Sequence, residues 1–122
     1  MKIVVVAIGG ALGAVARYGV AVLVARFWMG EFPLATFVIN VSGSFILGFF
    51  TPFAVEKSSL DPLWRLLVAT GFVGEYTTFS TFEYETQALT ETGATMIAVA
   101  NVVGSVIAGF AAVQLGVILA RR

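Results

Sequence analysis

The sequence predicts an all-α integral membrane protein with four transmembrane helices, the third of them broken. Of the 122 residues, 59% are hydrophobic and only 11% are charged, against about 25% charged residues in soluble domains. The charges also leave two long charge-free runs, 24 residues over Phe32–Val55 and 29 over Thr92–Ala120. A helix crosses a bilayer with roughly 20 apolar residues, so each run is long enough to span the membrane.

Four spans use nearly the whole chain as a single transmembrane domain, residues 1–122. The first span, about 3–28, is rich in glycine and alanine, and the second, about 33–55, begins at Pro33, which suits the first turn of a helix. A polar linker, EKSSLDP, precedes the third span, about 63–89. The fourth, about 94–120, ends at two arginines.

The third span contains the most unusual segment, GFVGEYTTFSTFEYE at Gly71–Glu85. Its glycines and consecutive hydroxyl residues weaken a helix or compete for its backbone hydrogen bonds. We therefore expect a helix break at membrane depth, where irregular backbone persists only if it is buried in protein or lines water. Carbonyls freed at such a break suit a hard cation, and the freed N–H groups suit an anion.

Composition excludes several other functions. The formal net charge is zero and no basic face is evident, which argues against nucleic-acid binding. Cysteine and histidine are both absent, so disulfides, thiol chemistry and histidine-based catalysis are excluded. Glu83 and Glu85 adjoin the membrane core without a nucleophile or a metal cluster, so we expect no enzyme activity.

Charge asymmetry predicts cytoplasmic termini. Four spans place both termini on one side of the membrane, and basic residues favour the cytoplasmic side. The opposite side carries only Arg26 near a span end. The termini's side carries five basic residues: Lys2, Lys57, Arg65, Arg121 and Arg122.

Polar groups within spans are costly and therefore informative. Arg17 either lies near a tilted helix end, where it snorkels or pairs with a carboxylate such as Glu85, or lines an aqueous vestibule that attracts anions. Asn40 makes an interhelical hydrogen bond or offers two N–H donors to a dehydrated anion. Asn101, with Ser105 on the same span, most simply serves helix packing and local hydrogen bonding, as do Gly43 and Gly48 for packing.

Phe79 and Phe82 are three residues apart, so they share a face if the helix resumes there. Two phenylalanines on a membrane helix usually pack or face lipid. Here they are interleaved with the hydroxyl residues Thr78, Ser80 and Thr81, which indicates that this side of the helix borders water. Because a benzene ring has a positive edge, ring edges offer a small anion a favourable contact without a fixed charge.

Three motifs together resemble the Fluc/CrcB fluoride channels: GGALGAVARYG at Gly9–Gly19, FVINVSGSFILG at Phe37–Gly48, and the Gly71–Glu85 segment. The resemblance extends over the whole chain. It implies a passive, fluoride-selective channel in a prokaryotic inner or plasma membrane. It also implies an antiparallel, dual-topology homodimer with two fluoride pores at the interface.

The resemblance also implies site roles, matched by motif position. Phe79 and Phe82 would be pore phenylalanines and Asn40 the pore amide, and Arg17 and Glu85 would belong to the vestibule. The backbone carbonyls of two residues would bind a structural Na⁺ in both copies: Gly74 and Thr77. Four hydroxyl residues would line or support the pore: Thr78, Ser80, Thr81 and Ser105.

Two features depart from the family pattern. Glu75 stands where small residues are usual, beside the expected Na⁺ site. The five-to-one charge bias is stronger than dual topology leads us to expect, and some relatives pair two chains of fixed orientation. Because this chain carries both Asn40 and the TTFSTF run, we expect a homodimer.

Two other functions remain open from the residues. A small proton-coupled cation or multidrug exporter is also a four-span, dual-topology dimer, but it needs an acid in its first span, where this chain has Arg17. A non-transporting assembly subunit would use its small residues only for packing. That function leaves the hydroxyls beside Phe79 and Phe82 without a purpose.

Overall fold

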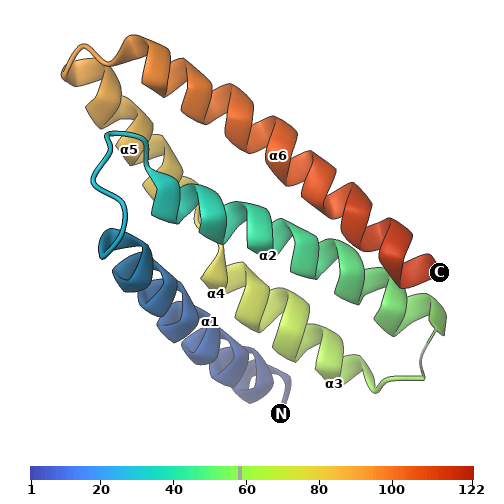
Figure 1. The fold of residues 1–122 in the computed structure, drawn as a ribbon. Coiled ribbons are helices and arrows are strands. Elements are labelled where there is room, and N and C mark those ends of the chain that lie inside the picture. Colours follow the sequence, from blue (N-terminus) through green and yellow to red (C-terminus); the bar gives the residue numbers. More distant parts are fainter. Residues whose placement is uncertain (58) are drawn as a thin grey trace.

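The computed structural model describes residues 1–57 and 59–122, and over those residues its secondary structure is helical. The elements form four rods (Figure 1). The first rod is α1 (Lys2–Ala25), and the second is α2 (Leu34–Pro52), continued by the π-helical η1 (Phe53–Lys57). The third rod consists of four pieces: α3 (Pro62–Arg65), π-helical η2 (Leu66–Val73), α4 (Gly74–Tyr76) and α5 (Phe79–Glu91). The fourth rod is α6 (Thr95–Arg121). Ser58, within the predicted linker, lies outside the described residues.

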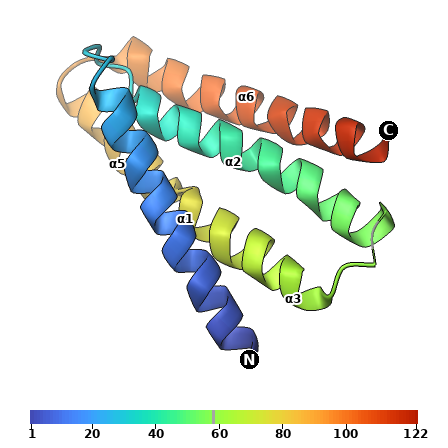
Figure 2. The same ribbon diagram turned by 60° about the horizontal axis from the view of Figure 1, so that its bottom comes forward.

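Three helical stretches are long and apolar enough to cross a membrane: Lys2–Ala25, Leu34–Lys57 and Thr95–Arg121. The third rod lies beside them and consists of shorter helical pieces (Figures 1 and 2). The chain is thus a multi-pass, all-helical membrane protein. The first helix ends at Ala25, three residues before the end of the predicted span.

Both chain termini, the end of η1 and the start of α3 lie toward one end of the molecule (Figures 1 and 2). The α1–α2 connection and the α5–α6 turn lie at the other end. Gly93 forms that turn with φ 83°, a backbone conformation that favours glycine. At the termini's end, Arg121 Nη2 and Nε donate to the Glu56 carboxylate at 2.8 and 3.1 Å, joining α6 to η1.

Glycines allow the rods to approach closely. On the α1–η2 contact, a Cβ added to Gly71 would lie 2.8 Å from the Val6 carbonyl oxygen. On the α2–α6 contact, a Cβ added to Gly116 would lie 2.6 Å from the Phe45 carbonyl oxygen. Gly48 packs against Val113, as expected from the sequence. Small residues at helix contacts are typical of membrane proteins, where packing rather than water exclusion holds helices together.

The start of the third rod follows from its sequence. The Asp61 carboxylate accepts a hydrogen bond from the Leu63 N–H at 2.8 Å and caps α3. Pro62 occupies the first turn, where its missing N–H costs nothing. The third rod, which carries the candidate site, therefore begins at Pro62, directly after the capping residue Asp61.

Candidate functional site

The third rod breaks at Thr77 and Thr78, as predicted. Thr77 (φ −79°, ψ 157°) and Thr78 (φ −150°, ψ 110°) have extended backbone between α4 and α5. Thr78 is the N-cap of α5, because its hydroxyl oxygen accepts from the Thr81 N–H at 3.3 Å. Thr77 donates its own hydroxyl back to the Val73 carbonyl at 2.9 Å. The two hydroxyl residues thus terminate one helix and start the next.

Asn40 of α2 holds this break in place. Its Nδ2 donates to the Thr78 carbonyl at 3.1 Å, and its Oδ1 accepts from the Thr78 N–H at 2.8 Å. This reciprocal pair fixes which amide atom is oxygen and which is nitrogen. The amide therefore makes the interhelical bond considered from the sequence. One of its two N–H groups remains for another acceptor.

The break removes the helical donors of the four carbonyls that precede it, Gly74 to Thr77. In a continuous helix the Thr78 N–H would donate to Gly74 and the Thr81 N–H to Thr77. Here they donate to Asn40 and to the Thr78 hydroxyl instead. The carbonyl oxygens of Gly74 and Thr77, the two expected at the Na⁺ site, are among the four released. Such oxygens are suitable ligands for a hard cation.

Arg17 lies at the break rather than beside Glu85. Its Nη1 donates to the Thr77 carbonyl at 3.5 Å, and its Nη2 lies 4.0 Å from Glu75 Oε2. Glu85 instead accepts a hydrogen bond from the Thr36 hydroxyl of α2. Arg17 thus lies beside a carboxylate, as one of the two alternatives predicted, but this carboxylate belongs to Glu75, and Glu85 as its partner is wrong. The acid that departs from the family pattern, Glu75, is the partner of Arg17.

A cavity of about 260 Å³ brings most of the predicted pore residues together. Phe79 and Phe82 lie on it with ring centroids 5.9 Å apart. Phe79 is 74% exposed, whereas Phe82 is 8% exposed. The lining residues are Asn40, Ser44, Thr77, Thr78, Phe79, Phe82, Ser105 and Val106.

A second cavity, of about 330 Å³, contains Arg17 together with the hydroxyl residues Thr36 and Thr81. It shares Thr78 with the first cavity, so polar groups line both cavities beside this residue. Ser80 is exposed on α5 and lines neither of these two cavities. The structure thus separates Ser80 from the other predicted hydroxyls.

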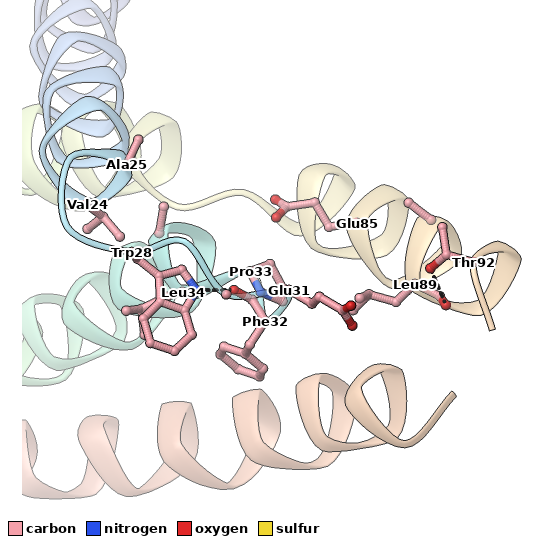
Figure 3. Close-up of a pocket in the computed structure, with 13 residues that line it drawn as sticks. Val24, Ala25, Trp28, Glu31, Phe32, Pro33, Leu34, Glu85, Leu89 and Thr92 are labelled. Carbon is pink, nitrogen blue, oxygen red and sulfur yellow. Dashed lines mark hydrogen bonds between the residues drawn. The ribbon is translucent and has the colours of Figure 1, made fainter. Parts of the chain in front are cut away.

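A larger cavity of about 560 Å³ lies where the α1–α2 connection meets α5 (Figure 3). Glu85 lies on its wall together with Glu31 of the connection. Trp28 closes the connection by donating from Nε1 to the Phe32 carbonyl at 2.7 Å. Sequence reasoning did not predict this cavity, because the connection that forms it carries no recognisable motif.

Sequence reasoning also missed two polar residues on α2. Thr36 contacts Glu85, and Ser44 donates to the Asn40 carbonyl at 2.7 Å and lines the smaller cavity. Their spacing was a usable signal. Thr36, Asn40 and Ser44 follow at intervals of four residues, so they form a polar stripe along one face of the helix.

These features define the class of the protein: a multi-pass membrane protein in which a broken helix lines polar cavities, as in ion channels and transporters. The family model of the CrcB-like protein, Camphor Resistance (CrcB), matches residues 4–117. The chain belongs to this family, which is one of ion channels and not of enzymes.

Curated relatives cover the chain from end to end. A protein of Solibacter usitatus is 44% identical over all 122 residues and over its own full length. One from Sulfurihydrogenibium sp. is 44% identical over 98% of this chain and 97% of its own. One from Acidobacterium capsulatum is 45% identical over 100% and 98%. All three are named fluoride-specific ion channel FluC.

Proposed function

We propose that this chain is a passive, fluoride-selective channel that lets fluoride leave the cytoplasm across a prokaryotic inner or plasma membrane. The observation that carries the proposal is the cavity at the helix break, where Asn40, Phe79, Phe82 and Ser105 meet. The name that the three relatives share supports fluoride as the ion.

The chemistry of this cavity suits a strongly hydrated anion. Conduction requires groups that replace the hydration shell but release the ion again. The free N–H of Asn40 and the ring edges of Phe79 and Phe82 are uncharged and weakly positive, and Arg17 in the neighbouring cavity raises the local anion concentration. A fixed charge inside the pathway would instead hold the ion.

A second, antiparallel copy completes the proposed channel. Phe79 is largely exposed in the single chain, so it is free to contribute to a pathway formed between two copies. The homodimer then contains two pores along its interface and is surrounded by lipid. Apolar side chains exposed along α1 and α6 are consistent with contact to lipid or to the second copy.

A structural Na⁺ at the centre of the dimer fits the donor set. The carbonyls of Gly74 and Thr77 have lost their helical donors, and two copies would supply four such oxygens. Arg17 Nη1 donates to the Thr77 carbonyl at 3.5 Å, and this long contact would leave the second lone pair of the oxygen for the cation. The bound cation would supply positive charge at the interface and brace both helix breaks.

The experiment that tests the function is ion efflux from liposomes containing the purified protein. Fluoride release is followed with an electrode beside a parallel chloride measurement, without a proton gradient and with protein-free liposomes as background. We expect fast fluoride release and little chloride release. Absence of fluoride release from folded dimers, or release only when a proton gradient is imposed, would overturn the proposal of a passive homodimeric channel.

A further inference from the structure

Asn101 of α6 is the most deeply buried polar side chain among the described residues, with 1% of its surface exposed. It does not line the 260 Å³ cavity, but its neighbour one turn along, Ser105, does. A buried amide is stable only when its donors and acceptor are hydrogen-bonded. The partners of Asn101 therefore indicate what it does.

These partners form one continuous series of hydrogen bonds from α6 to α5. The Ser105 hydroxyl donates to Asn101 Oδ1 at 3.2 Å, and Asn101 Nδ2 donates to the Thr86 hydroxyl oxygen at 2.9 Å. The Thr86 hydroxyl then donates to the Phe82 carbonyl at 2.8 Å. The series of hydrogen bonds begins at Ser105 on one wall of the cavity and ends at the backbone of Phe82 on another.

The last acceptor of this series, the Phe82 carbonyl, determines which group donates and which accepts in each of the three hydrogen bonds. The Phe82 carbonyl can only accept, so the Thr86 hydroxyl must donate its single proton to it. The Thr86 oxygen then accepts from Asn101, which turns the amide oxygen toward Ser105. Ser105 must in turn donate to that oxygen. The proton of Ser105 is therefore committed, and only its lone pairs are left for the cavity.

We propose that Asn101 is a positioning residue for anion selectivity: by holding the Ser105 proton, it makes Ser105 a donor only to an anion that competes successfully with an amide oxygen. The inference rests on the proposed fluoride pathway and concerns one wall of it. Fluoride is a strong hydrogen-bond acceptor, whereas chloride is larger and weaker. The committed hydroxyl therefore turns toward fluoride and not toward chloride.

Thr86 has a defined part in this arrangement, because its hydroxyl oxygen keeps the amide from turning over. Without it, Asn101 Nδ2 loses its partner and the amide is free to present its N–H groups to Ser105. The Ser105 proton would then be available to any anion. Both Asn101→Leu and Thr86→Val should consequently admit more chloride relative to fluoride.

The test measures fluoride and chloride efflux from liposomes for wild type, Asn101→Leu, Thr86→Val and the control Thr90→Val. Thr90 lies one turn further along α5 and bonds only locally, to Gln87. We expect the fluoride-to-chloride ratio to fall about tenfold in the first two variants, the effect of about one hydrogen bond. The control should match wild type. If Asn101→Leu fails to fold, the isosteric Thr86→Val carries the test.

A double-mutant cycle separates positioning from simple support of the fold. In the Ser105→Ala background, Asn101→Leu should change the ratio no further, because the hydroxyl that it controls is gone. Equal slowing of both anions with an unchanged ratio would overturn the inference, as would additive effects in the double variant. Failure of wild type to release fluoride would instead overturn the proposed function itself.

Discussion

Phe79 and Phe82 lie one turn apart on α5 but in different surroundings. Phe82 is buried against the protein, and Phe79 projects from it with 74% of its surface exposed. Both rings border the same cavity as Asn40. Replacing the exposed Phe79 should therefore affect folding less than replacing the buried Phe82, while both replacements test the role of the ring in transport.

Replacing either phenylalanine by isoleucine removes the ring edge and keeps the side chain apolar. We expect Phe79→Ile and Phe82→Ile each to reduce fluoride flux by up to about tenfold, if a ring edge contributes to anion binding as much as to an aromatic–aromatic contact, up to roughly 1.5 kcal/mol. Phe82→Ile should also lower stability by about 1 kcal/mol because Phe82 is buried. Liposome efflux and thermal unfolding measure the two effects.

Phe110→Ile provides the matched control, because Phe110 is exposed on α6 and borders none of the three cavities described above. Gel filtration of all three variants should show the same oligomer as wild type. Wild-type flux in both Phe79→Ile and Phe82→Ile would refute their place in the pathway.

Asn40→Asp changes the chemistry of the amide while conserving its shape. The carboxylate still accepts from the Thr78 N–H, but it has no N–H for the Thr78 carbonyl or for an anion. We expect fluoride transport to stop in a protein that remains folded. Gln87→Glu, the same chemical change at an exposed position of α5, serves as the control. Undiminished transport by Asn40→Asp would rule out a donor role for the amide.

At the scale of elements, the contact between α1 and the first half of the third rod positions the break. Gly9 and Gly13 present backbone to η2, and a Cβ on Gly13 would collide with the Phe72 carbonyl. Arg17 continues the same helix toward Thr77. The close approach of α1 is therefore what brings a guanidinium to the helix break.

A pair of alanine substitutions on α1 tests this packing. Gly13→Ala should destabilise the protein by about 1–3 kcal/mol, because backbone rather than a movable side chain blocks the new methyl group. Gly19→Ala meets nothing within 4 Å and should be neutral or stabilising by up to about 1 kcal/mol. Thermal unfolding in detergent distinguishes the two. Equal effects at both positions would contradict the assigned contact.

The molecule as a whole has an uneven distribution of basic residues, which bears on its orientation in the membrane. Both termini lie toward the end that carries Lys57 and Arg65 (Figure 2), so the basic residues counted from the sequence gather at one end. An antiparallel homodimer requires half of the chains to insert against this bias. The proposed assembly therefore depends on an orientation that can be measured directly.

Single cysteines report the orientation, because the chain has no native cysteine. We expect Ser59→Cys, at the termini's end, and Thr92→Cys, at the opposite end, each to react about half with a membrane-impermeant maleimide in intact cells. Permeabilised cells give the full signal as control. Labelling of Thr92→Cys alone would show one fixed orientation with cytoplasmic termini, and would exclude the antiparallel homodimer.

Removal of Na⁺ tests the proposed ion at the centre of the dimer. Exchange of Na⁺ for a bulky organic cation at constant ionic strength should lower the unfolding temperature and the fluoride flux together, because a ligand of the folded state stabilises it by mass action. Re-addition of Na⁺ should restore both. An unfolding temperature that does not depend on Na⁺ would contradict a structural cation.

Local properties of the sequence determined the class of the protein and the site of the helix break. Span length and the absence of charge follow directly from runs such as Thr92–Ala120. The residues around Thr77 and Thr78 weaken a helix through their own side chains. The motif at Gly71–Glu85 also indicated the family. None of these inferences requires knowledge of which helices touch.

Which polar groups meet, by contrast, depends on how the folded chain packs. Asn40 bonds Thr78 across 38 residues of sequence, Arg17 reaches Thr77 across 60, and Asn101 lies in a chain of bonds between two helices. Hydrophobic patterning places a residue within a span but does not specify its neighbour. In the membrane that choice depends on which small-residue faces pack together, and packing is a property of the folded chain.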